Sequence, residues 1–291
     1  MQLRRLLLML LAGGALAAAC ASAYADSDCR DPLFDWANAS ETDGSSRVNA
    51  SLIFDRPKLT QSPVTVGCGA VQLETGYTYM YDDENGVRVV RHSFPESLLR
   101  VGVIADWFEL RADWDYDIQR TKIGGAVDRE SGLADLNLGC KFYLTQQDCF
   151  LPQTGVILES SIPAGDQPFT SREVLPDIDY CYAWDLTGND CWTLSGNTEL
   201  GGTANQVTDD TYVRFTQTVA LDHAWSDRIH SFIEFYMFSP INSAADLPQY
   251  YFVRGTTVLI MDNLQWDIRT GLGLNKWADD FFAGTGLSLR Y

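Results

Sequence analysis

The sequence predicts an all-β protein, an antiparallel transmembrane β-barrel of about 12 strands with an irregular N-terminal arm. Three observations lead to this prediction: a secretory leader, long segments of alternating apolar and polar residues, and a final strand that ends on Tyr291. In that strand large or apolar residues recur at every second position from Phe281 to Tyr291. One apolar and one polar face are typical of a strand whose outer side meets lipid.

The first 25 residues have the features of a signal peptide. Arg4 and Arg5 precede an apolar stretch, and Ala23-Tyr24-Ala25 supplies a small-x-small cleavage site, so we expect cleavage after Ala25. An alternative interpretation makes Cys20 a lipidated residue. No later apolar run reaches the roughly 18–20 residues that a membrane helix needs, which excludes a helical membrane protein.

Composition narrows the function classes. The chain has 21 Lys and Arg against 39 Asp and Glu, a net charge of −18, which argues against nucleic acid as a partner. The 8 Trp and 13 Tyr suit the aromatic girdles of a barrel, although a soluble β-sandwich uses them too. Six of the 7 Cys follow the signal peptide. In an oxidising compartment they permit three disulfides, with free thiols as the alternative.

Residues 26–64 show no alternation and are rich in Asn, Asp, Ser, Thr and Pro. We interpret them as an irregular N-terminal arm that enters the barrel as a plug or lies at its periplasmic mouth. A disordered leader is the alternative. Cys29 and Cys68 are placed so that a disulfide between them would tie the arm to the first strand.

Residues 65–291 read as the barrel. Period-2 alternation predicts twelve strands, an even number as single-chain bacterial barrels have. Most runs are about 10–12 residues, which suits a tilted bilayer span better than the roughly 5–6 residues of globular strands. Long polar connections such as 120–132 and 164–177 alternate with short ones, which a soluble sandwich would not require. The predicted spans are 66–81, 87–105, 107–118, 134–144, 154–163, 178–187, 191–201, 211–222, 229–238, 250–260, 264–274 and 281–291.

If the apolar faces meet lipid, the opposite faces line the interior. The predicted lining is charged, so it forms either a satisfied ion network that fills the interior or a polar path that selects solutes. The excess of acids predicts a weak cation preference. Arg254 belongs to the basic residues expected inside. The candidate lining residues are Glu74, Arg100, Glu109, Arg111, Asp113, Asp115, Asp135, Lys141, Glu199, Arg214, Glu234, Asp267, Arg269 and Arg290.

Several stretches, in order along the chain, carry a family resemblance: FDRPKLTQSPVTVGCGAVQLETGYTY (54–79), PESLLRVGV (95–103), FELRADWDY (108–116), GLADLNLGCKFYL (132–144), GVILESSIPAGD (155–166), YAWDLT (182–187) and NLQWDIRTGLGLNKWADDFFAGTGLSLRY (263–291). The chain resembles the bacterial barrel family that is named for the meta-pathway of phenol degradation and often labelled as transporters. This resemblance implies an outer-membrane barrel that passes small, often hydrophobic compounds.

We therefore expect passage of small molecules, including hydrophobic or aromatic ones, across the outer membrane. The partners would be the lipid bilayer and a small-molecule solute, and the sequence leaves the oligomeric state open. The alternatives are a non-transporting structural or surface-interaction barrel and a soluble periplasmic β-protein. We expect no enzyme, cofactor or metal site. His92-Ser93 and His230-Ser231 are sequence neighbours, so their side chains point to opposite strand faces, and no metal-ligand spacing occurs.

Overall fold

The computed structural model describes residues 33–34, 53–188, 190–205, 210–241 and 247–291. The predicted signal peptide, Cys20, Cys29 and most of residues 26–52 lie outside these ranges. Within them, no helix is long and apolar enough to cross a membrane.

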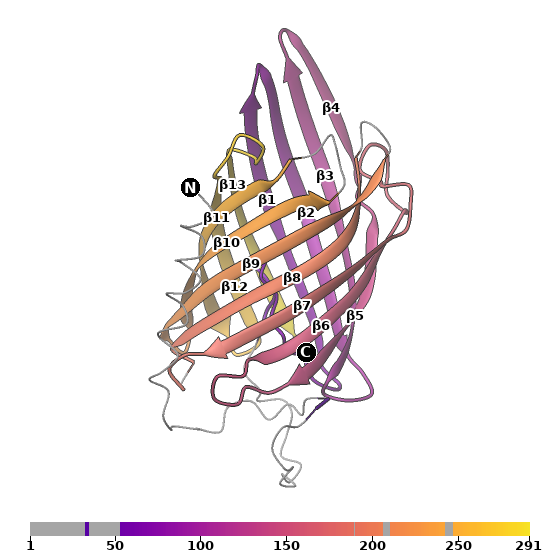
Figure 1. The fold of residues 1–291 in the computed structure, drawn as a ribbon. Helices are drawn as coiled ribbons and strands as arrows, with labels where there is room; N and C mark the ends of the chain where they lie inside the picture. The colour runs from indigo at the N-terminus through magenta and orange to yellow at the C-terminus, as the bar shows by residue number, and fades with distance from the viewer. Residues whose placement is uncertain (1–32, 35–52, 189, 206–209, 242–246) are drawn as a thin grey trace.

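The described chain forms thirteen antiparallel strands in one sheet (Figure 1). The strands are 8 to 16 residues long, and the longest are β2, β3 and β9. Their bounds are β1 Val71–Glu84, β2 Val87–Gly102, β3 Phe108–Ile123, β4 Ala126–Leu133, β5 Leu136–Thr145, β6 Gln153–Ile162, β7 Leu175–Asp185, β8 Trp192–Ala204, β9 Thr211–Ser226, β10 Ile229–Ile241, β11 Gln249–Met261, β12 Leu264–Gly273 and β13 Phe281–Arg290.

Twelve of these strands close into a ring. Consecutive strands pair with each other except that β5 pairs with β3 past β4, and the last strand, β13, pairs with β1 from Gln72↔Arg290 to Tyr81↔Phe281. The additional pairing of β2 with β3 completes the circle. Because a closed ring leaves no strand edge, every backbone group of the wall can be satisfied within the sheet, as a lipid environment demands. The predicted twelve-stranded antiparallel barrel is confirmed.

The one strand outside the ring is β4, and the sequence-based prediction does not contain it. We assigned residues 120–132 to a polar loop, but β3 continues to Ile123 and returns as β4. β4 and β5 both pair with β3, one after the other, and a break at Ala134 and Asp135 separates them. The β3–β4 hairpin projects beyond the ring (Figure 1). The polar, charged sequence there misled the prediction because both faces of a projecting hairpin meet solvent.

The first strand also begins later than expected, at Val71 instead of residue 66. Gly67 and Gly69 both have a φ of +84°, which glycine adopts readily and other residues rarely do. The chain turns sharply there, and a side chain on Gly102 of the neighbouring β2 would collide with the Gly67 carbonyl. Residues 53–70, which we call the inner segment, therefore form no strand and lead into β1 through this turn.

The two faces of the wall differ as the alternation predicts. Outward-facing residues include Leu110, Leu158, Trp266 and Leu287, whose side chains remain exposed, whereas Gln72, Glu109, Asp267 and Ser288 point inward and are wholly buried. An exposed apolar outer wall around a buried polar interior is the reverse of a soluble protein, and it fits a surrounding of hydrocarbon.

The structure shows no disulfide between any two of the five cysteines that it describes. Cys181 points into the interior and is fully buried, whereas Cys149 is exposed in the β5–β6 connection. The predicted three disulfides are thus not seen among these five residues.

Leu158 lies near the middle of β6, so placing a charge there tests the lipid-facing wall. We expect Leu158→Arg to lower the free energy of unfolding in lipid vesicles by about 2–4 kcal/mol, the cost of a cation at the lipid midplane. Val127 in β4 is equally exposed but lies on the projecting hairpin, so Val127→Arg should change stability by less than about 0.5 kcal/mol. Urea unfolding of both variants measures the contrast. Equal effects would place Leu158 outside the hydrocarbon.

Candidate functional site: the barrel interior

The inner segment lies inside the ring. Its contacts reach opposite sides of the wall: Lys58 binds Asp222 on β9, while Arg56 binds Glu96 on β2. On β12, the Arg269 guanidinium donates to the Pro57 carbonyl at 2.7 Å. A segment that touches strands on all sides of a closed ring must run through the interior.

Three glutamates of the wall hold the backbone of the inner segment. Glu74 on β1 accepts from the N–H groups of Asp55 and Arg56 at 3.2 and 2.7 Å. Glu109 on β3 accepts from the N–H of Val66 at 2.7 Å. An irregular segment cannot pair its own N–H groups, and buried N–H groups need partners, so these carboxylates stabilise it.

Glu234 on β10 holds the middle of the segment in the same way. Its two carboxylate oxygens accept from the N–H groups of Thr60 and Leu59, at 2.6 and 3.2 Å. Next along the chain, the Gln61 N–H donates to the Asn197 amide oxygen on β8 at 3.0 Å. The wall therefore fixes the segment from Asp55 to Val66.

Asp55 is the centre of a buried ion network. The residue is 4% exposed, and its carboxylate lies 2.7 Å from the Arg111 guanidinium, 3.0 Å from the Lys141 ammonium and 3.4 Å from the Arg100 guanidinium. These three cations come from β3, β5 and β2. Asp55 thus joins the inner segment to three strands by charge.

The same cations also bind carboxylates of the wall. Arg100, which is wholly buried, donates to both oxygens of Glu109 at 2.8 and 3.0 Å and to Glu74 at 3.3 Å. Arg111 contacts Glu159 at 2.7 Å. Buried charges are costly unless paired and hydrogen-bonded, and each of these has several partners.

A second, smaller ion cluster surrounds Arg56. Its guanidinium lies 2.8 Å from Glu96 and 3.5 Å from Asp267, and Arg269 contacts Glu96 at 3.6 Å. Residues of β2 and β12 thereby bind one side chain of the inner segment. A side chain on Gly76 or Gly286 would collide with the Arg56 guanidinium, so these glycines make room for it.

Burial alone would raise the pKa of Asp55, but Arg100, Lys141 and Arg111 together hold it well below its usual value. A carboxyl whose pKa falls on folding adds stability above its unfolded pKa, and that stability is lost as pH drops through the folded pKa. We expect the difference in ionic conductance between the unmodified protein and Asp55→Asn to stay constant from about pH 7 to about pH 5, above the unfolded Asp pKa of about 3.9, and to shrink only in stronger acid. A rise between pH 7 and pH 5 that Asp55→Asn abolishes would contradict this assignment.

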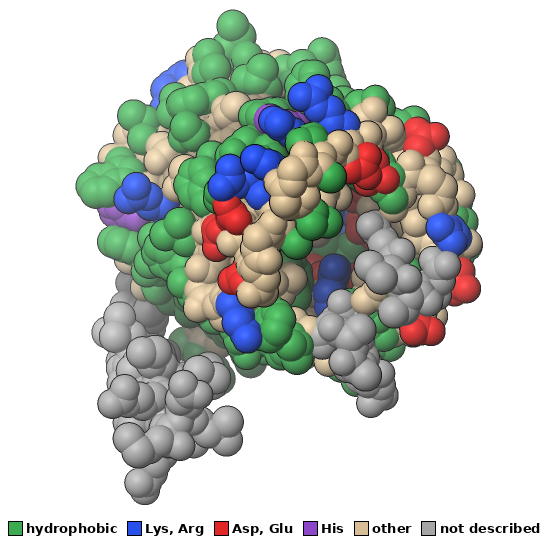
Figure 2. Space-filling model, turned by 90° about the horizontal axis from the view of Figure 1, so that it is seen from above, with side chains coloured by type: hydrophobic (Ala, Val, Ile, Leu, Met, Phe, Trp, Pro, Cys, Tyr) green, Lys and Arg blue, Asp and Glu red, His purple; other side chains and the backbone are tan. Residues whose placement is uncertain are grey.

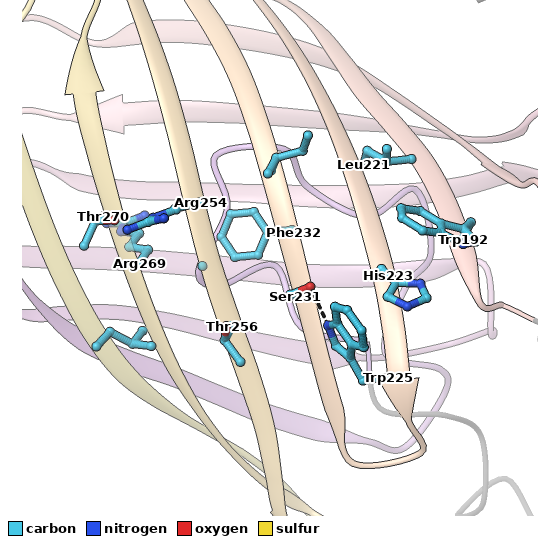
Figure 3. A pocket seen from close by; sticks show the side chains of 13 residues that line it. Trp192, Leu221, His223, Trp225, Ser231, Phe232, Arg254, Thr256, Arg269 and Thr270 are labelled. Carbon is cyan, nitrogen blue, oxygen red and sulfur yellow. Dashed lines mark hydrogen bonds between the residues drawn. The ribbon is translucent and has the colours of Figure 1, made fainter.

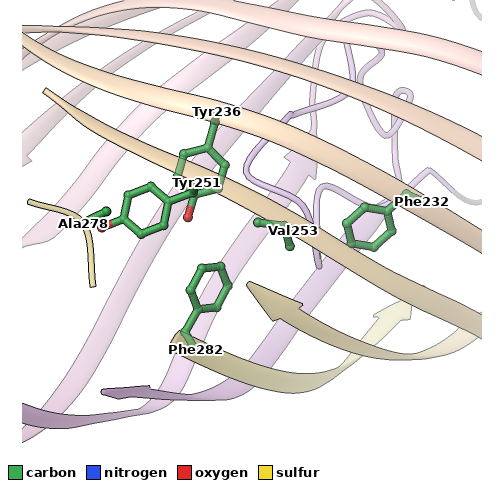
Figure 4. Packing of buried hydrophobic residues seen from close by; sticks show 6 residues of the cluster. All are labelled: Phe232, Tyr236, Tyr251, Val253, Ala278 and Phe282. Carbon is green, nitrogen blue, oxygen red and sulfur yellow. The ribbon is translucent and has the colours of Figure 1, made fainter. Parts of the chain in front are cut away.

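The inner segment contacts mainly one half of the interior, at the end of the barrel where the chain terminates. The half towards the other end of the barrel has an aromatic side. Phe232, Tyr236, Tyr251, Val253, Ala278 and Phe282 form a buried cluster there (Figure 4). The Tyr236 and Tyr251 rings stack with centroids 4.8 Å apart, and Phe282 meets Tyr251 edge-on at 6.2 Å. Leu59 of the inner segment packs against this cluster, which we call the aromatic wall.

The opposite side of the interior is acidic. Inward-facing carboxylates follow β3, β7 and β8: Asp113, Asp115, Asp177, Asp179 and Glu199. Arg214 pairs with Glu199 at 3.2 Å, and Asn197 donates to Asp179 at 2.5 Å. Figure 2 looks onto the end from which the β3–β4 hairpin projects, and the ring is hollowed there with acidic and basic side chains inside.

The structure brings most of the predicted lining residues into contact with the inner segment or its ion clusters. Asp113, Asp115, Glu199 and Arg214 face the interior farther along, on the acidic side. Asp135 differs: it lies in the break between β4 and β5, where its carboxylate accepts from Gly165 and Ser171 and fixes the β6–β7 loop. The predicted lining residues that contact the inner segment or its ion clusters are Glu74, Arg100, Glu109, Arg111, Lys141, Glu234, Asp267, Arg269 and Arg290.

The inward position predicted for Arg254 is wrong. The prediction places it among the interior cations, but it points outward on β11, on the same face as Phe252. Its partner positions are Ile233 on β10 and Thr270 on β12, both on the outer wall. A basic residue in a strand was assumed to point inward, and the strict period of the strand overrules that assumption.

The residues that sequence reasoning missed are Asp55, Arg56 and Lys58 of the inner segment. They lie in a stretch without periodicity, so no pattern assigns them a face. A signal was nevertheless present: charged residues stand immediately before the barrel, and the predicted interior carries both signs of charge that need partners.

A closed antiparallel ring with an apolar outer wall and a charged, partly filled interior defines a β-barrel of the outer-membrane type. The family model described as "Putative MetA-pathway of phenol degradation" matches residues 54–291, so the chain belongs to this family. The match begins within the inner segment. The resemblance read from the sequence is thereby confirmed.

Solved structures share the fold. An outer membrane channel from Pseudomonas putida F1 superposes with a TM-score of 0.63, at 13% identity over 79% of this chain and 98% of that one. The transport unit of the autotransporter AIDA-I from Escherichia coli has a TM-score of 0.50, at 10% identity over 84% of this chain and 94% of that one. Both likenesses show the fold alone. No curated protein sequence matches the chain.

Proposed function

We propose that this protein is an outer-membrane channel for small molecules and that its inner segment narrows the passage. One observation carries the proposal: beyond the inner segment, the interior has an aromatic wall on one side and carboxylates on the other. A wall of aromatic rings favours apolar and aromatic bodies and attracts cations, and carboxylates favour positive or hydrogen-bond-donating groups. The solutes that fit best are therefore small aromatic molecules that are cationic or carry a donor group. Passage needs no catalytic step.

Uptake into protein-containing liposomes tests the proposal with three permanently charged solutes. Benzyltrimethylammonium has an aromatic body and a positive charge, benzenesulfonate has the aromatic body with a negative charge, and tetramethylammonium has the charge alone. We expect benzyltrimethylammonium to enter severalfold faster than either of the others. Faster entry of benzenesulfonate would contradict the assigned lining.

A second candidate is a barrel that does not transport. The density of buried ion pairs between the inner segment and the wall favours it, because such pairs can fix the segment permanently. In that case none of the three solutes would enter faster than into protein-free liposomes.

The acidic side also predicts ion selectivity. In a planar bilayer under a KCl gradient, we expect a reversal potential that indicates a moderate preference for K⁺ over Cl⁻. Replacing Asp113 and Asp115 together by Asn should move this potential towards zero, because both face the passage. Asp262→Asn is the matched control, since Asp262 is exposed in the β11–β12 turn. A Cl⁻ preference in the unmodified protein would contradict the prediction.

A further inference from the structure

The outer wall carries a groove that the channel function does not use. It has a volume of about 620 Å³ and lies over β8 to β12 (Figure 3). At one end Trp192, His223 and Trp225 form an aromatic edge, with ring centroids 4.2 and 4.5 Å apart. At the other end lies Arg254, with Thr256 and Thr270. Pockets that bind small molecules have this size, and most of the lining here is apolar.

Arg254 is unusual because it is the one Lys, Arg, Asp or Glu at the outward positions of β9 to β12. Those positions are otherwise apolar, aromatic or uncharged, as Val219, Ile233, Phe252 and Ile268 illustrate. In the described part of the chain, the Arg254 guanidinium has no ion pair or hydrogen bond. The Thr256 and Thr270 hydroxyls have no hydrogen bond there either.

The depth of Arg254 makes this charge costly. It lies five residues from the first residue of β11, Gln249, and seven from the last, Met261. With a rise of about 3.3 Å per residue and the tilt of a barrel strand, this position is close to the midplane. A cation on the lipid face there costs about 2–4 kcal/mol when unpaired. Bilayer phosphates lie about 15 Å from the midplane, too far to serve as its regular partner.

We propose that this groove binds a hydrophobic monocarboxylate, with the carboxylate on Arg254 and the apolar body along the groove towards Trp225. The guanidinium supplies a planar pair of donors that matches a carboxylate. Thr256 lies two residues farther along β11 and Thr270 lies opposite Arg254 on β12, so both can add a hydroxyl. The occupant must carry a single anion on an apolar body, because Arg254 is the one cation whose side chain points outward in the groove. Arg269 also borders the groove, but its guanidinium is turned into the interior, where it donates to the Pro57 carbonyl. The site lies outside the interior, so it does not depend on the proposed channel function.

Photolabelling in phosphatidylcholine vesicles tests the proposal. The probe is hexadecanoic acid with a chain diazirine, and its methyl ester has the same body without the charge. After irradiation, mass spectrometry locates the adducts. We expect the acid to label the groove, at residues such as Ile233 and Thr256, and Arg254→Gln to reduce this labelling at least tenfold. Arg254→Lys should retain most of it, and the ester should label the outer wall without dependence on residue 254.

Arg228→Gln is the matched control, because Arg228 is exposed in the β9–β10 turn and pairs with Asp262. Its labelling should equal that of the unmodified protein. Heat-dependent gel mobility confirms that each variant is folded, and removing an outward charge should not impair folding.

Equal labelling by acid and ester, or undiminished labelling of folded Arg254→Gln, would overturn the proposal. Stronger competition by phosphatidic acid than by hexadecanoic acid would assign the site to a lipid headgroup, and labelling suppressed by association of two chains would assign it to a second copy.

Discussion

Replacing Asp55 with Asn is expected to loosen the inner segment and to raise the ionic conductance of the barrel at least twofold. The substitution removes the anion that Arg100, Arg111 and Lys141 share. Breaking a buried pair by removing one partner costs about 3–5 kcal/mol, because the remaining charges stay buried. The segment can avoid that cost by leaving its position, which lets water reach the three cations.

Single-channel recordings in planar bilayers measure this change. Asp262→Asn serves again as the control. Among the residues that the structure describes, the exposed Asp262 pairs only with the exposed Arg228, so its replacement should leave conductance unchanged. If Asp55→Asn lowers thermal stability but leaves conductance as it was, the inner segment stabilises the barrel without narrowing the passage.

Replacing Arg100 with Leu is expected to give the largest loss of stability among single substitutions in the interior. Arg100 pairs with Glu74 and Glu109, and it also donates to the Val64 carbonyl at 3.1 Å. Leu fills much of the space but removes the cation that joins two buried carboxylates, and Glu109 then keeps only its 3.1 Å contact with Arg111 among the ion pairs described. We expect the free energy of unfolding to fall by about 3–5 kcal/mol.

Urea unfolding in lipid vesicles measures this loss, and Arg120→Leu is the control. Arg120 lies on the exposed, projecting part of β3, so its replacement should change stability by less than about 0.5 kcal/mol. A double variant with Asp55→Asn should lose less than the sum of the single losses, because both substitutions disrupt one network. Additive losses would show that Arg100 and Asp55 act independently.

The ring itself was predictable because one physical rule governs every strand. Lipid outside and a polar interior force a period of two, so Leu110 and Glu109 could be assigned to opposite faces from their spacing alone. The same alternation gave the number of strands in the ring, and the alternation of long and short loops agreed with it. The same rule failed at β4, because a hairpin beyond the membrane has no lipid-facing side and needs no apolar alternation.

The content of the interior was less predictable. Glu74, Glu109 and Glu234 were expected to face inward, but their role in holding backbone N–H groups depends on where an irregular segment runs. Nothing in the spacing of Asp55 or Lys58 encodes that path. Arg254 shows the opposite error, since its charge was taken as evidence for an inward position that its place in the strand does not allow.

A reversible cross-link between Gln61 and Asn197 tests the central claim most directly. In the structure the Gln61 N–H donates to the Asn197 side chain across the interior. Both residues are replaced by Cys in a background without native cysteines that carries Asp55→Asn, and a short cleavable thiol cross-linker joins them. We predict that the cross-link forms in the folded barrel, returns the raised conductance to the unmodified level, and that cleavage raises it again. Failure to cross-link the folded barrel, or a conductance that cross-linking does not change, would contradict a passage narrowed by residues 53–70.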